Sequence, residues 1–379
     1  MGFSIWAMRL NYTVVVAISF VCLCPGIAAT PAFAQSAEAQ ALIDKFGLRE
    51  SGPPVRDIAG WKAPRKVVVW QNEDRLPALT AAYPSIKFET VAKSDSLPAA
   101  LKNAEVFIGY CVPAAIDSDH KLRWMMSLAV GVEGCAASEV LKRQRTIVTN
   151  VRGLSGPEIA DHAIALMMAL NRGLDGFIAN QPAGNWQRDL YADQIWELED
   201  RTILVVGLGG IGKEVALRAH GLGMKVIATR NSRREGPDYV SYVGLSHELL
   251  ELTKQADVVV NTVPLTDKTR GMFNAKFFKA MRPHAYFISV GRGASTNTDD
   301  LLAALRNGEL GGAGLDVTDP EPLPADHPLW RQPRVIITPH VAFRSDKLRE
   351  RNWILVGENL RRYINGDKLL SVVNLERGY

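Results

Sequence analysis

The sequence contains few cysteines, and their spacing matches no common metal site. Four occur in 379 residues, and Cys22 and Cys24 fall in an amino-terminal segment that we expect to be removed. Cys111 and Cys135 remain, and neither belongs to a C-x-x-C pair. A disulfide between them is one interpretation, but two buried thiols are the interpretation that we favour. The sequence therefore predicts no metal site.

The chain also lacks a strong excess of charge of either sign. Its 44 basic and 40 acidic side chains leave a net charge of +4. That balance is too small to indicate binding to nucleic acid or to an anionic membrane surface. With 379 residues the chain is long enough for two domains, because single hydrophobic cores stop growing at roughly 250–300 residues.

The apolar run near the amino terminus is too short for a membrane span. Residues 13–23 are apolar, whereas a span needs about 20 such residues. Arg9 precedes the run, and Ala32-Phe33-Ala34 follows it. A basic start, an apolar run and an A-x-A site predict a signal peptide cleaved after Ala34, and hence an exported protein. The alternatives are an uncleaved anchor and a start at Met8, and without export the protein would be cytoplasmic.

A glycine-rich turn is the clearest functional motif. Residues 202–206 form an apolar, largely β-branched run that leads into Gly207-x-Gly209-x-x-Gly212, and a helical stretch follows. This order of strand, turn and helix is that of a dinucleotide-binding βαβ unit. Gly207 permits the turn, Gly209 lets the backbone approach a pyrophosphate, and Gly212 lets helix and strand pack closely. Free N–H groups at the start of the helix would face the phosphates. An ordinary βα turn that binds no phosphate is the alternative.

The residues after the next strand indicate which dinucleotide binds. Arg230 follows that strand at about the position where NAD-binding proteins carry an acid that bonds the ribose. No acidic residue occurs before Glu235, whereas Arg230 and Arg233 can hold a 2′-phosphate through charge-assisted hydrogen bonds. We therefore favour NADP over NAD. The alternative is that Arg230 stacks on adenine while NAD binds.

Short strands alternate with helical segments along the chain after residue 63. This alternation predicts α/β architecture with parallel sheets covered by helices on both faces. A long helix that opens near Gly156 could cross between two domains, and we interpret His162 on it as structural or interfacial. The predicted strands are residues 65–70, 85–91, 104–109, 122–128, 146–150, 202–206, 224–229, 256–262, 285–290, 313–317 and 334–340.

Several residues with chemical potential stand after predicted strands, where open α/β sheets place their ligands. Gly131, in the loop after residues 122–128, would leave backbone amides free to meet an anionic group. Arg292, Glu321 and His340 follow later strands. An arginine for a carboxylate, a histidine for proton transfer and an acid that orients and charges the histidine make a hydride-transfer site.

These motifs, in this order, resemble those of the D-isomer-specific 2-hydroxyacid dehydrogenases, and the match extends from about Lys66 to Asn374. The resemblance implies an α/β protein with two doubly wound parallel-sheet domains, in which a Rossmann cofactor domain is inserted in a flavodoxin-like substrate domain. The motifs are Gly207-x-Gly209-x-x-Gly212, Val290-Gly291-Arg292-Gly293, Gly314-Leu315-Asp316-Val317 followed by Glu321-Pro322, and Thr338-Pro339-His340. The expected boundaries are 1–34 for the signal peptide, 35–62 for a linker with a short helix, 63–156 and 341–379 for the substrate domain, and 157–340 for the dinucleotide-binding domain.

The resemblance also implies roles for the candidate residues. His340 would protonate the 2-keto oxygen during reduction, and Glu321 would hydrogen-bond His340 and keep it protonated. Arg292 would bind the substrate carboxylate, whose other side the amides of Val130 and Gly131 would hold. The expected cofactor-binding residues are Gly207, Gly209, Gly210, Ile211, Gly212, Arg230, Ser232, Arg233, Thr262, Val263, Pro264, Val290 and Asp316, the last at the nicotinamide end.

Within that family, Arg230 with Arg233 is the pattern of NADP-using glyoxylate and hydroxypyruvate reductases. We therefore expect a reductase of small 2-keto acids that forms a homodimer. Three departures put the substrate in doubt: Ser289 replaces a frequent Asn, residues 294–298 are unusually polar, and Phe343-Arg344 replaces small residues. The alternatives are a dinucleotide-sensing binding protein on the same scaffold and a phosphite- or formate-oxidising enzyme, although the latter expects an amide in place of Glu321. Export also conflicts with the supply of NADP.

Overall fold

The computed structural model describes residues 35–70, 76–118 and 121–376. The predicted signal peptide therefore lies outside the described residues. Within those ranges, no helix has the length and apolar character needed to cross a membrane. The short helix predicted in the linker is confirmed as α1 (Ala37–Phe46), which the Ser36 hydroxyl caps by accepting a hydrogen bond from the Ala39 amide at 3.1 Å.

The first sheet is parallel and has five strands in the order β3-β2-β4-β5-β6. This is the flavodoxin-like order that the sequence led us to expect. Val67, Val68 and Val69 are fully buried, as a central strand covered on both faces requires. The strands are β2 (Lys66–Trp70), β3 (Lys87–Val91), β4 (Val106–Gly109), β5 (Trp124–Ser127) and β6 (Ile147–Thr149), and the helices among them are α2 (Leu76–Ala82), α3 (Leu97–Leu101), α4 (Pro113–Ile116), α5 (Glu133–Ala137) and α6 (Glu139–Gln144).

The second sheet is also parallel and has seven strands in the order β13-β12-β11-β10-β7-β8-β9. Strands β7, β8 and β9 run outward on one side of the switch point between β7 and β10, which is the Rossmann arrangement. Its strands are β7 (Thr202–Val206), β8 (Lys225–Arg230), β9 (Tyr242–Leu245), β10 (Val258–Asn261), β11 (Tyr286–Ser289), β12 (Gly312–Leu315) and β13 (Val335–Ile337).

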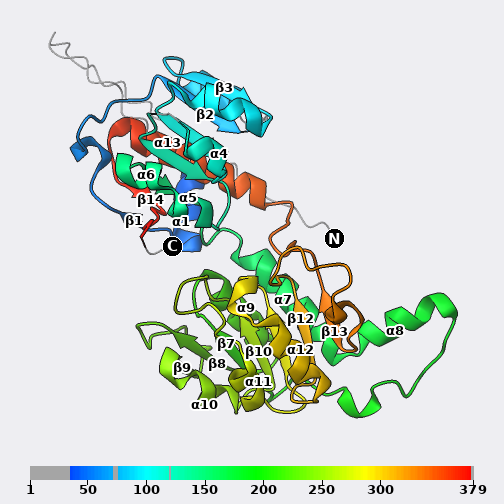
Figure 1. Ribbon diagram of the computed structural model, residues 1–379. Coiled ribbons are helices and arrows are strands. Elements are labelled where there is room, and N and C mark those ends of the chain that lie inside the picture. The colour runs from blue at the N-terminus through cyan, green and yellow to red at the C-terminus, as the bar shows by residue number, and fades with distance from the viewer. Residues whose placement is uncertain (1–34, 71–75, 119–120, 377–379) are drawn as a thin grey trace, which may run out of the picture. The chain divides into compact units, whose positions relative to one another are not determined.

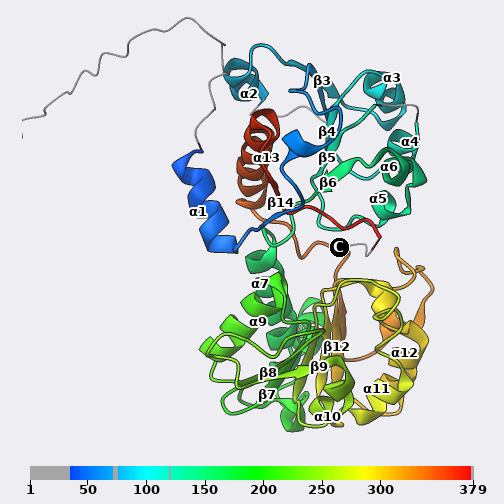
Figure 2. The same ribbon diagram turned by 90° about the vertical axis from the view of Figure 1, so that its left-hand side faces the viewer.

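Helices cover both faces of the seven-stranded sheet (Figures 1 and 2). One buried cluster joins the sheet to α7 (Gly156–Asn171) and α9 (Gly210–Gly221). The other joins its opposite face to α10 (Leu249–Thr253), α11 (Ala275–Ala280) and α12 (Thr298–Arg306). The α/β architecture with two parallel sheets is therefore confirmed.

The carboxyl-terminal segment returns to the first sheet. Helix α13 (Leu348–Asn365) packs against α1, and β14 (Leu369–Leu370) pairs antiparallel with β1 (Glu50–Ser51). Beyond β14, the Val373 amide donates a hydrogen bond to the Val148 carbonyl in β6 at 2.8 Å. The assignment of residues 341–379 to the substrate domain, with its boundaries, remains a prediction.

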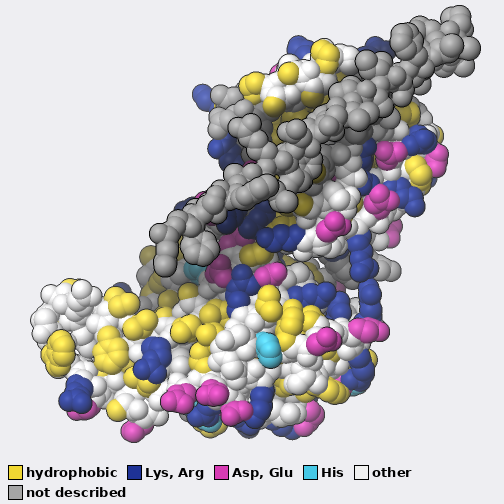
Figure 3. Space-filling model, turned by 180° about the vertical axis from the view of Figure 1, so that it is seen from behind, with side chains coloured by type: hydrophobic (Ala, Val, Ile, Leu, Met, Phe, Trp, Pro, Cys, Tyr) yellow, Lys and Arg dark blue, Asp and Glu magenta, His cyan; other side chains and the backbone are white. Residues whose placement is uncertain are grey.

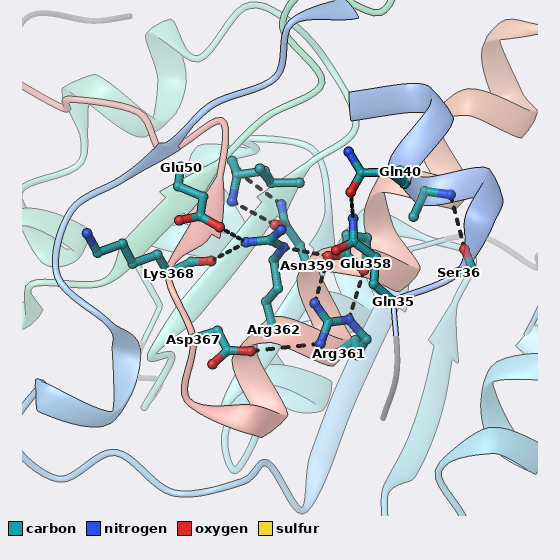
Figure 4. A network of polar contacts seen from close by, with 12 residues as sticks. Gln35, Ser36, Gln40, Glu50, Glu358, Asn359, Arg361, Arg362, Asp367 and Lys368 are labelled. Atoms are coloured by element: carbon teal, nitrogen blue, oxygen red, sulfur yellow. Dashed lines mark hydrogen bonds and ion pairs between the residues drawn. The ribbon is translucent and has the colours of Figure 1, made fainter. Parts of the chain in front are cut away.

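A cluster of ion pairs on α13 fixes this return (Figure 4). The buried Glu358 carboxylate accepts hydrogen bonds from Arg361 at 2.8 and 2.9 Å and from Arg362 at 2.5 Å. Arg362 also pairs with Glu50 of β1 and donates to the Lys368 carbonyl at 3.1 Å. Both Glu358 oxygens are thus used, and α13 is tied to both strands of the small antiparallel sheet.

Cys111 and Cys135 form a disulfide, so our interpretation of two buried thiols was wrong. The bond joins the segment after β4 to α5, which brings together residues 24 positions apart. Spacing along the chain did not reveal this pairing, because the two cysteines meet only when β4 and β5 lie side by side.

Strands β1, β9 and β14 were also missed; each lies at the edge of its sheet, and β1 and β14 have two residues each.

Apolar side chains remain exposed on α8 (Leu174–Asn180) and in the segment after it. Leu174 is 42% exposed, Ile178 62% and Trp186 95%. Figure 3 shows hydrophobic side chains gathered over this part of the molecule.

Candidate active site

The glycine turn lies between β7 and α9, where the sequence predicted it. Gly207 has a φ of +100°, which favours glycine. A methyl group at Gly212 would lie 2.3 Å from the Gly207 carbonyl oxygen, so only glycine lets helix and strand approach this closely. At Gly209 a methyl group would meet no atom within 4 Å, and Gly209 and Gly210 are exposed at the start of α9. The turn therefore leaves open space and helix N–H groups for an anion, and half-buried Ile211 follows within the helix.

Three arginines lie at the end of β8 and just after it, and they differ in their partners. Arg234 forms an ion pair with Glu248 at 2.7 Å and donates to the Tyr242 hydroxyl at 3.0 Å. Arg230 donates to the Glu235 backbone carbonyl at 2.7 Å. Among the described residues, no carboxylate pairs with Arg230 or with the exposed Arg233, and Ser232 beside it is exposed as well. These two guanidinium groups therefore keep donors that can hold a phosphate.

The ends of β10 and β11 lie beside the glycine turn. The Thr262 hydroxyl donates to the Gly207 carbonyl at 2.7 Å. Val263 is buried, and its amide donates to the Asn261 side chain at 3.1 Å, whereas Pro264 is exposed. Val290 at the end of β11 is buried. The strand ends that the sequence assigned to the cofactor thus lie at the same edge of the sheet as the glycine turn.

The loop that carries His340 is held by the buried Asp316. The Asp316 carboxylate accepts hydrogen bonds from the Val341 amide at 2.9 Å, the Ala342 amide at 3.0 Å and the Thr338 hydroxyl at 2.7 Å. His162 contacts the same group, with its Nε2 atom 2.8 Å from the Thr338 hydroxyl. The Asp316 side chain therefore holds the backbone of the loop, and His162 contacts Thr338 beside it, while the structural or interfacial role of His162 stays a prediction.

His340 adopts a conformation that few residues other than glycine adopt. Its φ is +51°, which costs about 1–3 kcal/mol and persists only where the surroundings impose it. The His340 amide donates to the Asp316 carbonyl at 2.9 Å, which supplies that constraint. The His340 Nδ1 atom lies 2.5 Å from Glu321 Oε1, and the side chains of both are about two-fifths exposed. The two residues that the sequence predicted as an acid/base pair are thus in contact, and the other ring nitrogen is left for a ligand.

Arg292 lies next to the loop that contains Gly131. The Arg292 Nη1 group donates to the Gly291 carbonyl at 2.8 Å, and its Nε group donates to Glu133 Oε1 at 3.0 Å. A methyl group at Gly131 would lie 2.8 Å from Arg292 Nη2. Within the described residues, the Val130 and Gly131 amides donate no hydrogen bond, while the Val130 carbonyl accepts one from Asn150 at 2.8 Å. The predicted carboxylate-binding groups are thus adjacent and have free donors.

Glu133 is a member of this cluster that our sequence reasoning missed. Burial alone would raise its pKa, but the Arg292 guanidinium, a backbone hydrogen bond and His340 together hold the pKa below its ordinary value. Arg292, Glu133 and His340 therefore share one electrostatic environment. Its place directly after the glycine loop was the available signal.

Ser289 and Ser295 hold the turn that presents Arg292. Asn261 donates to the Ser289 hydroxyl at 3.0 Å and to the Ser295 hydroxyl at 2.8 Å. The Ser295 hydroxyl in turn donates to the Arg292 carbonyl at 2.6 Å. The polar residues that depart from the family pattern therefore support the backbone of Arg292, and the roles of Asn261 and Ser295 were not predicted.

Two further features are a cavity away from the candidate site and the lack of a metal-binding cluster among the described residues. A cavity of about 610 Å³, lined by Trp196, Tyr286 and Arg334 among others, lies at the amino-terminal ends of β11 to β13, opposite the edge that carries the candidate site. Among the described residues, no three His, Cys, Asp or Glu side chains are grouped as a metal site requires.

Comparison with known proteins gives a consistent result. A family model described as "D-isomer specific 2-hydroxyacid dehydrogenase, NAD binding domain" matches residues 164–342. A glyoxylate reductase from Korarchaeum cryptofilum is 32% identical over 331 residues, which cover 85% of this chain and 94% of that protein.

Solved structures agree with these matches. A D-isomer-specific 2-hydroxyacid dehydrogenase family protein from Aeromonas salmonicida is 30% identical with a TM-score of 0.72, and the match covers 82% of this chain and 99% of the other. An NADPH-dependent glyoxylate/hydroxypyruvate reductase from Sinorhizobium meliloti, in complex with NADP and sulfate, is 25% identical with a TM-score of 0.71; the match covers 83% of this chain and 99% of that one.

Proposed function

Because the chain belongs to the D-isomer-specific 2-hydroxyacid dehydrogenase family, we propose that it reduces a small 2-keto acid of the glyoxylate or hydroxypyruvate type to the 2-hydroxy acid. As a member of that family it is an NAD(P)-dependent oxidoreductase. The observation that carries the proposal is the His340–Glu321 pair, which shares an electrostatic environment with Arg292 through Glu133.

In this proposal Arg292 binds the carboxylate of the substrate. Its Nη2 group lies close to Gly131, because a methyl group there would be 2.8 Å from Nη2, and we assign the Val130 and Gly131 amides to the other side of the carboxylate. A guanidinium and two backbone amides suit a planar carboxylate, because charge-assisted hydrogen bonds are about twice as strong as neutral ones. Binding of the carboxylate in this way positions the keto carbon of the substrate for reaction.

His340 acts as the general acid. When bound, the nicotinamide supplies the hydride to the keto carbon, and His340 donates a proton from Nε2 to the keto oxygen. Its Nδ1 atom faces Glu321, which orients the ring and compensates the positive charge of the imidazolium. Asp316 acts as a positioning residue, because it fixes the loop on which His340 stands.

The glycine turn fits a dinucleotide, and the favoured one is NADP. Gly209 leaves room for a pyrophosphate at the start of α9, while Gly207 permits the turn and Gly212 permits the close approach of helix and strand. Arg230 and Arg233 are the donors for a 2′-phosphate, and the first acidic residue after β8 is Glu235. We assign the remaining contacts to Gly210, Ile211, Ser232, Thr262, Val263, Pro264 and Val290.

The main test measures NADPH and NADH oxidation with a panel of 2-keto acids, for wild type, His340→Ala and the control His247→Ala. His247 is an exposed histidine whose Nε2 atom lies 3.9 Å from Glu248, and it is not among the proposed site residues. We expect His340→Ala to lower kcat by about 10²–10⁴-fold, the usual contribution of general acid catalysis, with His247→Ala unchanged. Full activity in His340→Ala would refute the mechanism, and an inactive wild type that still binds NADP would support a dinucleotide sensor instead.

The cofactor assignment is tested with Arg230→Asp. A carboxylate at this position would repel a 2′-phosphate and accept hydrogen bonds from ribose. We expect NADPH use to be lost and NADH use to be gained, measured as kcat/KM for each cofactor. The control is Arg234→Asp, since Arg234 is already paired with Glu248. Unchanged preference in Arg230→Asp would contradict the assignment.

Export and dimerisation complete the proposal. The Cys111–Cys135 disulfide supports export, because disulfides persist mainly in oxidising compartments. N-terminal sequencing after cell fractionation tests export, and an intact Met1 in the cytosol would contradict it.

Exposed Ile178 and Trp186 support a homodimer. Analytical ultracentrifugation of wild type and Trp186→Ala tests the dimer, and a monomeric wild type would contradict it.

A further inference from the structure

Glu133 lies beside the donors that the proposed function gives to the substrate, and it already accepts a hydrogen bond from the same guanidinium. It is the first residue of α5, two positions after Gly131, so its side chain folds back over the glycine loop. One carboxylate oxygen, Oε1, accepts the hydrogen bond from Arg292 Nε at 3.0 Å. The other, Oε2, lies where a methyl group at Gly131 would be 2.6 Å away. A carboxylate of the chain itself therefore lies close to both Gly131 and Arg292.

The electrostatics of this contact keep Glu133 charged but leave it free to move. Burial raises the pKa of Glu133, but Arg292, a backbone hydrogen bond and His340 together hold it below its ordinary value, so the carboxylate is ionised at neutral pH. Its side chain is 54% exposed, and that of Arg292 is 27% exposed. Ion pairs with this exposure are weak, because water screens them and the side chains lose freedom on pairing. A second carboxylate can therefore replace Glu133 on Arg292.

We propose that Glu133 is an internal competitor, a carboxylate that binds Arg292 in the free enzyme and that the substrate carboxylate displaces. This inference rests on the proposed function, since it needs Arg292 as the carboxylate ligand. After displacement Glu133 stays tethered beside the site and keeps its negative charge. It therefore selects for substrates with a single carboxylate, and it disfavours those with a second negative charge near the keto group.

The experiment uses oxamate and oxalate, two inhibitors of nearly equal shape that carry one and two carboxylates. Their inhibition constants are measured with the full chain, together with KM and kcat for glyoxylate, in wild type and Glu133→Gln. The control is Glu139→Gln, which removes an exposed glutamate of α6 that pairs with Lys142. The same substitution in an Arg292→Ala background completes a double-mutant cycle.

We expect Glu133→Gln to lower KM for glyoxylate and the inhibition constant of oxamate by about twofold to fivefold, the factor that an exposed ion pair is worth. The inhibition constant of oxalate falls further than that of oxamate, because the repulsion of the second charge disappears. The fall in KM exceeds any change in kcat, and Glu139→Gln matches wild type. In the Arg292→Ala background, Glu133→Gln has no effect, because the competed group is gone.

Each contrary result is distinguishable. If Arg292→Ala raises KM but Glu133→Gln leaves KM and both inhibition constants unchanged, the proposed function stands and the competitor is refuted. If Glu133→Gln raises KM, Glu133 is a positioning residue for Arg292 and the inference is wrong. If Arg292→Ala itself leaves KM and kcat unchanged, the assignment of Arg292 fails, and the inference fails with it.

Discussion

Two groups of ion pairs in this chain differ in how many of their hydrogen-bond donors and acceptors are already paired. In the cluster on α13, Glu358 is buried and both its oxygens accept hydrogen bonds from Arg361 and Arg362. In the candidate site, Arg292 keeps a free Nη2 group, and the paired side chains of His340 and Glu321 are about two-fifths exposed. Charged side chains thus have their hydrogen-bonding atoms occupied in the α13 cluster, whereas in the candidate site some of these atoms remain available to a ligand.

The difference follows from what burial does to a charge. A buried carboxylate must have every lone pair satisfied, because an unpaired charge in a dry interior is costly. Such a cluster fixes structure and offers nothing to a ligand. An exposed pair contributes little to stability, but it can exchange its partner at small cost. We therefore expect substitutions in the α13 cluster to affect folding, and substitutions in the site to affect catalysis.

The largest expected effect is on stability, for Glu358→Ala. Removing this carboxylate leaves Arg362 buried without its principal partner on α13. Breaking a buried pair in this way costs about 3–5 kcal/mol, measured as the free energy of unfolding in urea. The control Glu139→Ala breaks an exposed pair and should cost at most about 1 kcal/mol. The comparison would be contradicted if both variants lost the same small amount.

A second test removes the covalent link in the substrate-binding region. The Cys111–Cys135 disulfide closes a loop of 24 residues and anchors α5, the helix that begins with Glu133. For loops of this length the bond contributes about 2–4 kcal/mol to stability. We expect the double variant Cys111→Ser/Cys135→Ser to lose that amount, and reducing agent to destabilise wild type but not the variant. Two free thiols in the native, unreduced protein would disprove the bond.

Glu321→Gln should leave the fold intact and slow the reaction. The amide keeps the shape of the side chain but loses the charge that faces His340 Nδ1. Because general acid catalysis contributes about 10²–10⁴-fold in all, we expect the loss of this partner to lower kcat by about tenfold to a hundredfold. The free energy of unfolding should change by less than about 0.5 kcal/mol, since the pair is exposed. Glu251→Gln, in an exposed pair with Lys254, is the control, and equal kcat in both variants would count against the role of Glu321.

Much of the fold followed from local patterns. Buried runs such as Thr202–Val206 have no alternation of polar residues, because a parallel strand is covered on both faces. The glycine positions were also informative. Gly212 must be glycine because a methyl group there would clash with the Gly207 carbonyl, and these two residues are close in the sequence. Edge strand β9 has a weaker pattern, with only its two central residues buried, and so it was missed.

The site could be predicted only in part. Arg292, Glu321 and His340 stand in motifs, so their types and order were visible in the sequence. Glu133 and Asn261 were missed because their roles arise from contacts across about 159 and 34 positions of the chain, with Arg292 and Ser295 respectively. The disulfide was misjudged for the same reason. Pairings that depend on two strands lying side by side carry no local signal in a single sequence.

Asp257 combines features of both groups and has the smallest expected effect. Its carboxylate is buried at the start of β10 and accepts hydrogen bonds from the Thr202 amide and from Arg282, both at 2.8 Å, while His284 lies 3.3 Å away. Burial would raise its pKa, but these donors together hold the pKa below its ordinary value. Because the pKa of Asp257 is lower in the folded state, its charge stabilises the fold at pH values above its pKa in the unfolded state. This stabilisation is lost as the pH falls through its pKa in the folded state.

We expect Asp257→Asn to cost about 1–2 kcal/mol at pH 7, and the difference from wild type to shrink below about pH 4. The control Asp200→Asn, in an exposed pair with Lys225, should show no such pH dependence in urea unfolding. A constant difference between Asp257→Asn and wild type from pH 7 down to pH 3 would mean that the charge of Asp257 contributes nothing, and that this carboxylate is held by packing alone.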